Sequence, residues 1–300
     1  MSEVKNITTN YCGRSTFIIS GGGALGISAI GSFKAILDNT EMSHIITEAT
    51  HFVGCSVGSI LALMLALRVP ITANSNKTFI EILEEDLVYG FDGKKICAPI
   101  KLDRLITDYG ICDGSGVVEY VIDILKHANM SSDATLGDIH TLTGNIFCIS
   151  TICVETGLEY FDSVNASSLP IVTAIRMSTA IPIFYTPVKH NCKHYIDAAT
   201  NENPLPVGAP GVGDCYYGIQ FLHKAKTTMK ISSLQSFIMS MSRLNTKKHI
   251  NLIDRVRVIV LKMPFHPLTV DLPMDIKKKI ISLGNVQTNN WINLRLKKND

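Results

Sequence analysis

The sequence predicts an α/β protein in which helices pack in layers on a largely parallel β-sheet. Three observations support this fold class. In the N-terminal half, short apolar runs alternate with stretches of helical periodicity, as in repeated strand–helix units. Two glycine-rich turns each stand between an expected strand and an expected helix. A chain of 300 residues that is 46% hydrophobic can bury a large core, and the absence of repeats and low-complexity linkers favours a single domain.

The expected elements can be placed in order along the chain. Residues 17–20 predict a first strand, residues 21–23 a turn and residues 24–37 a helix. Residues 51–53 predict a second short strand, which runs through another glycine-rich turn into an apolar helix at residues 59–67.

The pattern continues more loosely towards the C-terminus. Residues 146–149 predict a strand, and residues 159–161 can pair beside it. Residues 171–180 predict a helix that stops before Pro182, because proline cannot continue a helix. Beyond Gly218 the periodicity weakens, and no element is assigned there.

The composition excludes several classes of protein. The hydrophobic content is too high for a disordered chain, and 21 Gly and 11 Pro are too few for a collagen. The longest apolar run, residues 57–67, is about half as long as a membrane span. Residues 1–14 hold no apolar stretch of the kind found in secretory signals. We therefore expect a cytoplasmic protein without a transmembrane segment, whose eight cysteines are reduced.

The net charge of +2 hides an uneven distribution. Residues 221–300 hold 15 Lys or Arg and 4 Asp or Glu, so this stretch carries +11, and the rest of the chain carries −9. A basic stretch of this size is either a solvated surface or a face that contacts an acidic partner such as an anionic membrane. No aromatic–basic module accompanies it, so we expect no nucleic-acid partner.

The first candidate site is Gly54-Cys-Ser-Val-Gly58, between the second strand and the apolar helix. A serine on such a tight turn projects its hydroxyl toward a substrate, and glycines two positions away relieve crowding between strand and helix. The helix N-terminus adds positive potential and free N–H groups. We therefore interpret Ser56 as a nucleophile, with Gly54 and Gly58 as the glycines of its turn. The alternative is an ordinary serine in a glycine-rich turn.

The second candidate is Gly21-Gly-Gly-Ala-Leu-Gly26, which satisfies the G-x-G-x-x-G pattern of dinucleotide-binding proteins. That use needs an acidic residue about 20 positions further on, at the end of a strand. Glu41 and Glu48 lie near that distance, but no apolar strand leads to either. The same geometry can form an oxyanion hole, in which consecutive glycine N–H groups stabilise a developing negative oxygen. The serine on the second turn favours the oxyanion hole.

The third candidate is Asp197, which ends a short apolar run ahead of a polar loop. This placement suits a functional carboxylate, although an Asp at a strand end is also a common turn cap.

Together these segments resemble the patatin-like phospholipase family over about residues 15–207. The glycine loop from Gly21, the Ser56 turn and the Asp197 segment have the order and approximate spacing of that family. Four further segments are similar to parts of the family pattern. Residues 108–114 resemble its glycine turn, and Thr135-Leu-Gly-Asp138 resembles the helix start that follows. Residues 178–188 resemble its proline-containing stretch, and Asn203 resembles the loop after its aspartate.

The resemblance implies a three-layer α/β/α fold and hydrolysis of lipid acyl esters through an acyl-enzyme. Ser56 would be the nucleophile and Asp197 its partner in a Ser–Asp dyad, while Gly22 and Gly23 would donate oxyanion-hole N–H groups. The substrate would be a phospholipid or another acyl lipid, and neither a metal nor a cofactor would be needed. Residues 15–207 would form the catalytic domain, with residues 208–300 as a basic extension packed on it.

Two departures from the family pattern affect the site. The family usually places Gly after the aspartate, whereas Ala198 and Ala199 follow Asp197 here. If the first position adopts a positive φ, alanine would cost roughly 1 kcal/mol and shift the carboxylate. Leu25 stands where many members carry Arg or Lys, which removes a cation near the oxyanion site.

Other functions remain open on sequence alone. A Ser–His–acid triad could draw its histidine from His223, His249 or His266. The chain could also be a catalytically weak patatin-like protein that binds lipid or regulates a partner, or an oxidoreductase that uses the glycine loop for a nucleotide. Cys55 could be a thiol nucleophile, but its position in the turn points it elsewhere.

Overall fold

The computed structural model describes residues 14–89, 96–97, 99–200, 205–213, 215–223, 255–267, 269 and 272–297. Asn203, His249 and parts of the basic C-terminal stretch lie outside the described residues.

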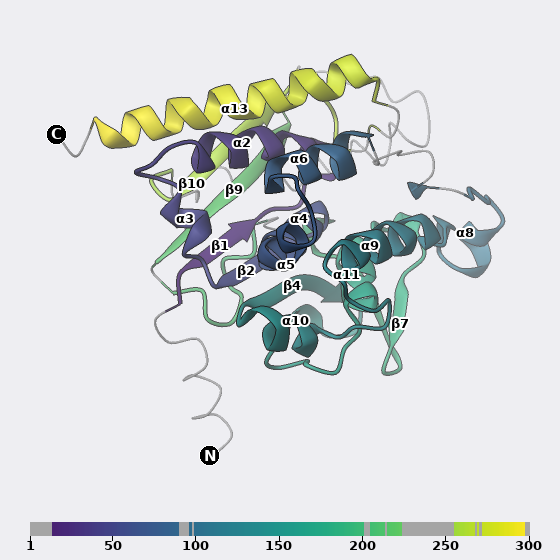
Figure 1. The fold of residues 1–300 in the computed structure, drawn as a ribbon. Coiled ribbons are helices and arrows are strands. Elements are labelled where there is room, and N and C mark those ends of the chain that lie inside the picture. Colours follow the sequence, from purple (N-terminus) through teal and green to yellow (C-terminus); the bar gives the residue numbers. More distant parts are fainter. Residues whose placement is uncertain are drawn as a thin grey trace.

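An eight-stranded mixed sheet forms the centre of the molecule, in the order β10-β9-β1-β2-β4-β8-β7, with β5 also paired to β4 (Figure 1). Neighbours from β10 to β4 are parallel, whereas β5, β7 and β8 pair antiparallel. The strands of this sheet are β1 (Thr16–Ile19), β2 (His51–Cys55), β4 (Ile146–Cys153), β5 (Gly157–Asp162), β7 (Val188–His190), β8 (Lys193–Asp197), β9 (Tyr216–His223) and β10 (Val258–Met263). A separate two-stranded sheet pairs β3 (Gly110–Cys112) with β6 (Ile183–Tyr185).

Helices flank the central sheet, and the α/β class expected from the sequence is confirmed (Figure 1). In chain order the helices are η1 (Gly23–Ile27), α2 (Ser28–Leu37), α3 (His44–Thr47), α4 (Val57–Ala66), α5 (Arg68–Ala73), α6 (Phe79–Glu84), η2 (Glu85–Tyr89), α8 (Arg104–Thr107), α9 (Ser115–His127), α10 (Leu136–Thr143), α11 (Ile171–Thr179), η3 (Ala198–Thr200) and α13 (Met274–Leu296).

The two faces of the sheet bury different side chains, because successive residues of a strand point in opposite directions. Phe17, Phe52 and Phe147 are paired across β1, β2 and β4, and they belong to the large core shared with the helices. Ile18 and Val53 face the other way, into a smaller cluster. The central strands are therefore apolar on both faces, as buried parallel strands are.

The register on β4 brings the ends of two distant strands together. Residues 148–150 of β4 pair with both β2 and β5, so these two strands lie on opposite edges of β4. Residues 151–153 pair with β5 and β8, which places β8 on the same edge as β2. The last residue of β2 pairs with Ser150, and the last residue of β8, Asp197, pairs with Thr151. The chain that leaves β2 therefore meets the end of β8.

The C-terminal part of the chain completes the sheet, which the sequence did not predict. Strand β9 pairs with β1, and β10 pairs with β9. Helix α13 lies along α2 (Figure 1), and the Thr288 hydroxyl donates to the Ser32 hydroxyl at 2.7 Å. Trp291 donates from its indole nitrogen to the Arg255 carbonyl at 3.1 Å. Helix α13 is thus docked on the body of the protein.

One expected element differs in detail, and another is present as expected. The helix predicted from residue 24 begins as the 3-10 turn η1 and becomes α-helical only at Ser28. The expected helix start at Thr135 is present as a capping box, in which Thr135 and Asp138 bond each other's backbone N–H groups.

Seven cysteines fall within the described residues, and all seven are free thiols. Within the described part of the chain, no helix has both the length and the apolar character required to cross a membrane.

Candidate active site

Ser56 lies on a strained turn between β2 and α4. It is the N-cap of α4, with φ 54° and ψ −128°, a backbone conformation that non-glycine residues rarely adopt. Such a conformation costs about 1–3 kcal/mol and persists only where the surrounding structure holds it. The turn directs the serine into a pocket, as expected for a nucleophile elbow.

Gly54 and Gly58 are required by close backbone contacts around this turn. A Cβ at Gly54 would lie 2.3 Å from the Gly58 carbonyl oxygen, and a Cβ at Gly58 would lie 2.4 Å from the Ile19 carbonyl oxygen. Any side chain at these positions would therefore push β2, α4 and β1 apart, and the two glycines have the steric role that the sequence pattern predicts.

Two further serines hold the Ser56 backbone. The Ser56 amide donates to the Ser178 hydroxyl at 2.9 Å, and that hydroxyl donates in turn to the Ser150 carbonyl at 2.8 Å. The Ser59 hydroxyl donates to the Ser56 carbonyl at 2.6 Å. Ser59 is fully buried, which agrees with a packing role. Sequence reasoning did not assign a role to Ser178; the only signal was its place in the segment similar to the family's proline-containing stretch.

Asp197 is buried beside Ser56 at the end of β8, with a relative exposure of 1%. Its Oδ1 accepts a hydrogen bond from the Ala199 backbone at 2.8 Å. Burial raises the pKa of this carboxyl from 3.8 to about 6, although hydrogen bonds from Ser56, Ala199 and Cys55 oppose the rise by favouring the charged form. A carboxyl with this pKa is ionised at neutral pH and can still accept a proton, which suits a general base.

The Cys55 thiol lies behind this pair and donates to Asp197 Oδ1 at 3.9 Å. Burial first, and the nearby Asp197 charge second, raise the pKa of the thiol far above its usual range. The sulfur is therefore protonated at neutral pH, whereas a cysteine nucleophile must be a thiolate. The geometry thus assigns Cys55 a contact with the carboxylate and argues against a thiol nucleophile.

Ala198 and Ala199 fit the turn after Asp197 without backbone strain. Neither residue has a positive φ, and both belong to the 3-10 turn η3. The expected cost of alanine at a glycine position is therefore absent. Ala199 also fills space beside the glycine loop, because a Cβ at Gly21 would lie 2.6 Å from the Ala199 Cβ.

The glycine loop lies directly against Ser56. A Cβ added to Gly21 would be 3.3 Å from the Ser56 Cβ, which is a tight contact, and its 2.6 Å approach to the Ala199 Cβ excludes a larger residue there. Gly22 packs on Phe221 of β9, and Gly23, with φ 50°, approaches the Pro267 carbonyl oxygen. The Ala24 amide donates to this carbonyl at 2.8 Å. Among the described residues, no backbone carbonyl accepts a hydrogen bond from the amides of Gly22 and Gly23.

Leu25 and the two glutamates considered for a nucleotide site can also be placed. Leu25 is buried in the core, so a charged side chain there would have no exit to solvent. Glu41 and Glu48 are exposed and precede β2, and neither lies at the carboxyl end of a strand. Neither glutamate is therefore placed as the acidic partner that a dinucleotide site requires.

A largely apolar pocket opens in front of Ser56. It encloses about 720 Å³ of empty space, counting the part that is open to solvent. Gly23 and Ala24 line it beside Ser56, and helix α9 contributes Val117 and Tyr120. The remaining wall is formed by Val57, Ile60, Ile96, Cys97, Thr179, Ile181, Phe184, Tyr185, Pro267 and Thr269. Such a lining can hold a hydrocarbon chain close to the serine.

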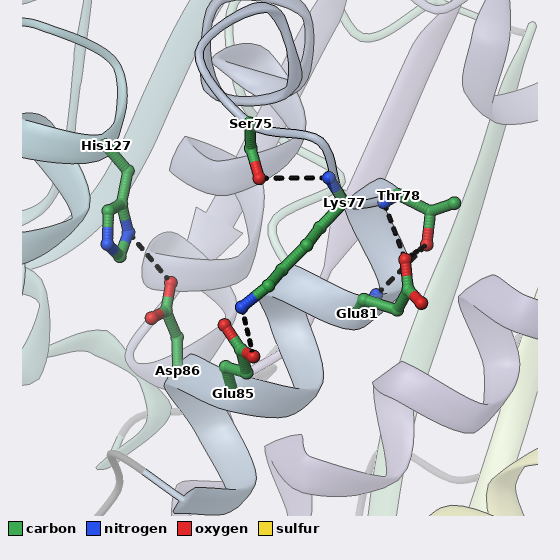
Figure 2. A network of polar contacts seen from close by, with 7 residues as sticks. All are labelled: Ser75, Lys77, Thr78, Glu81, Glu85, Asp86 and His127. Carbon is green, nitrogen blue, oxygen red and sulfur yellow. Dashed lines mark hydrogen bonds and ion pairs between the residues drawn. The ribbon is translucent and has the colours of Figure 1, made fainter.

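A polar contact outside the pocket links helix α9 to η2. His127, its last residue, lies 3.3 Å from Asp86 of η2, and a capping box of Thr78 and Glu81 starts the preceding helix α6 (Figure 2). Burial raises the pKa of Asp86, and the histidine opposes this rise. This ion pair connects η2 to α9, whose Tyr120 lines the pocket.

Neither described histidine of the possible triad lines the pocket. His223 and His266 instead pack edge to face, with ring centroids 5.2 Å apart. Among the described residues, no group of three or more His, Cys, Asp or Glu side chains is placed to hold a metal ion.

Comparison with known proteins gives one consistent relationship. The family model described as patatin-like phospholipase matches residues 17–209. The probable lipid hydrolase 463L of Invertebrate iridescent virus 6 is 23% identical over 202 residues, which cover 64% of this chain and 62% of that protein. The uncharacterized protein YqhO of Bacillus subtilis (strain 168) is 23% identical over 183 residues, 57% of each chain. The chain thus spans less than two thirds of the length of these curated relatives.

One solved structure supports the same fold. VipD from Legionella pneumophila superposes with a TM-score of 0.56 at 13% sequence identity, and the match covers 94% of this chain and 67% of that one. At this identity the likeness concerns the fold alone.

Proposed function

Because this chain belongs to the patatin-like phospholipase family, we propose that it hydrolyses acyl esters of lipids, with Ser56 as nucleophile and Asp197 as general base. One observation carries the proposal: Ser56, on its strained turn, stands between a buried carboxyl of raised pKa and an apolar pocket. A nucleophile, a base and a place for a hydrocarbon chain are therefore adjacent.

The reaction would proceed through an acyl-enzyme. Asp197 accepts the proton of the Ser56 hydroxyl as its oxygen attacks the ester carbonyl, and the amides of Gly22 and Gly23 stabilise the resulting oxyanion. The tetrahedral intermediate collapses, and the alcohol portion of the lipid leaves with the proton from Asp197. Water then attacks the acyl-enzyme while Asp197 accepts its proton, and Asp197 returns this proton to the Ser56 oxygen as the fatty acid leaves.

The substrate that fits this site is a phospholipid or another acyl lipid. The pocket wall offers apolar surface to the acyl chain, and the ester would lie at Ser56, where the glycine loop meets the pocket. The reaction uses side chains and backbone amides of the chain itself, so we propose that it needs no cofactor.

Labelling with a fluorophosphonate probe tests the nucleophile directly. We expect covalent labelling of the full chain, and no labelling after Ser56→Ala. Ser163→Ala is the matched control, because it removes a buried hydroxyl that bonds the Phe147 amide of β4 and leaves the one at position 56; it should still be labelled. Equal labelling of wild type and Ser56→Ala would disprove the assignment.

Fatty-acid release from phospholipid vesicles tests the dyad. Ser56→Ala and Asp197→Asn should each lower the rate by at least about a thousandfold, as losses of nucleophile and base do elsewhere. Replacing His223, His249 and His266 should leave the rate within a few-fold, whereas its collapse in a folded variant would indicate a triad. If the wild-type chain binds lipid but neither releases fatty acid nor reacts with the probe, the alternative function holds, in which the chain is a catalytically weak protein that binds lipid. Stabilisation by NAD without labelling would indicate the oxidoreductase.

A further inference from the structure

A short segment beside the pocket exposes an unusual concentration of large apolar side chains. We call residues 99–109 the apolar loop. Within it Ile100, Leu102, Ile106 and Tyr109 have relative exposures of 61%, 70%, 84% and 66%. Single exposed apolar residues are normal on protein surfaces, but four within eleven residues are a concentration of the kind found at interaction sites.

The apolar loop is attached to the wall of the pocket. At its base the Cys112 thiol donates to the Cys97 carbonyl at 2.8 Å, and the Lys101 amide donates to the Ile111 carbonyl at 2.8 Å. Cys97 itself lines the pocket. Cys112 also pairs with Tyr185 through β3 and β6, and Tyr185 is another lining residue.

The loop projects away from the central sheet. Helix α8, within it, lies at the outer end of the molecule in Figure 1, beyond α9 and β7. No buried residue occurs in α8, although Arg104 forms an ion pair with Asp113 at 2.7 Å that ties the helix to the following turn. The exposed side chains are therefore carried on a segment fixed at its base and directed outward.

The loop carries no net charge, which bears on the kind of partner that it fits. Lys101 and Arg104 are balanced by Asp103 and Asp108. An electrostatic contact with an anionic surface would need an excess of cations, and salt would weaken it. Burial of apolar side chains needs no excess of cations, and salt does not weaken it.

We propose that the apolar loop inserts into the surface of a phospholipid bilayer and seats the mouth of the Ser56 pocket on the membrane. The partner is a lipid surface because the loop is continuous with the wall of a pocket suited to an acyl chain. Side chains such as Leu102 and Ile106 enter the boundary between headgroups and acyl chains, where apolar residues of peripheral proteins lie. The route of the substrate from bilayer to Ser56 rests on the proposed function, but the attachment itself does not.

The test measures partition onto phosphatidylcholine vesicles, which carry no net charge. All chains contain Ser56→Ala, so that the lipid is not consumed. We expect Leu102→Asp combined with Ile106→Asp to weaken partition at least tenfold, because two exposed side chains lose their transfer into the bilayer. Raising the salt from 50 to 500 mM should change the partition of the parent by less than twofold.

A matched control places the same substitutions elsewhere on the surface. Val69 of α5 and Leu294 of α13 have relative exposures of 65% and 67%, close to those of the loop residues. Val69→Asp combined with Leu294→Asp adds the same charge and should leave partition within twofold. Because all four positions are exposed, the variants should keep the thermal unfolding midpoint of the parent, which circular dichroism checks.

Each outcome decides the proposal. If the parent does not bind the vesicles, or if loop and control variants bind equally well, the apolar loop does not contact the bilayer. If the loop variant abolishes self-association measured by ultracentrifugation but keeps its partition, the loop contacts a second copy of the chain instead.

An activity arm separates this proposal from the proposed function. In chains with Ser56 intact, the ratio of vesicle turnover to turnover of a dissolved short-chain ester should fall at least fivefold in the loop variant. If neither substrate is hydrolysed, the proposed function fails, and the partition experiment still decides the membrane contact.

Discussion

At Asp197 two physical effects act in opposite directions. Removal from water disfavours the charged carboxylate, while hydrogen bonds from Ser56, Ala199 and Cys55 favour it. Burial prevails, and the pKa is raised to about 6. The residue is thus a stronger base than an exposed aspartate but is still ionised at pH 7. The strained Ser56 backbone and the buried carboxyl each cost stability, as is common where residues are arranged for chemistry.

The pH dependence of activity follows from this pKa. A general base must be unprotonated, so kcat/KM should be constant above about pH 7 and fall about tenfold per pH unit well below pH 6. The rate of a dissolved ester, measured from pH 4.5 to 8 with far-ultraviolet circular dichroism as a check on folding, gives the profile. A flat profile from pH 5 to 7.5 in a folded protein would contradict Asp197 as the base.

At the scale of single elements, the crossing of α2 and α13 depends on two glycines. A Cβ at Gly31 would overlap with the Ile281 carbonyl oxygen, and a Cβ at Gly284 would lie only 2.1 Å from the Ser28 carbonyl oxygen. The helix backbones are therefore in direct contact. Asn285 adds a side-chain hydrogen bond to the Gly31 carbonyl at 3.2 Å. This crossing is the reason why the last helix is part of the protein body.

We expect Gly284→Ala to destabilise the protein by about 1–3 kcal/mol or more, because the added methyl group separates the two helices. Gly213→Ala is the matched control: nothing lies within 4 Å of its Cβ position, and its φ is not positive, so its effect should be small. Urea unfolding followed by circular dichroism measures both. Equal stability of the two variants would mean that the close contact is absent in solution.

At the scale of the whole molecule, the site depends on segments far apart in the chain. Phe221 of β9 supports Gly22, and Pro267, after β10, contacts Gly23 and Ala24. Both residues lie beyond residue 209, where the family match ends. Strands β9 and β10 also extend the sheet from β1, whose edge they cover.

A fragment that ends at residue 209 should therefore fail to fold cooperatively. It would expose the edge of β1 and the apolar surface of α2, and it would remove the contacts of the glycine loop. Urea unfolding of the fragment and of the full chain, together with fluorophosphonate labelling, tests this. A fragment with a sigmoidal unfolding curve and a labelled Ser56 would show instead that residues 15–207 form an independent catalytic domain.

The sequence predicted those features that depend on neighbouring residues. The Ser56 turn, its two glycines, the strands around it and the start of α10 follow from steric and capping requirements within a few residues. The glycine loop could be identified for the same reason. The position of Asp197 beside the Ser56 turn, by contrast, depends on the strand register along β4.

The tertiary structure decided what depends on residues distant in the chain. Strand β9 was missed because Gly218 interrupts its pattern, yet Gly218 is needed there: a Cβ would lie 2.5 Å from the Ile18 side chain. Three further features also arise only when separate segments pack together. They are the hydrogen bond that the Ser56 amide donates to the Ser178 hydroxyl, the raised pKa of Asp197, and the contact of Pro267 with the glycine loop. Burial and long-range contact are properties of the folded chain, so local sequence patterns cannot specify them.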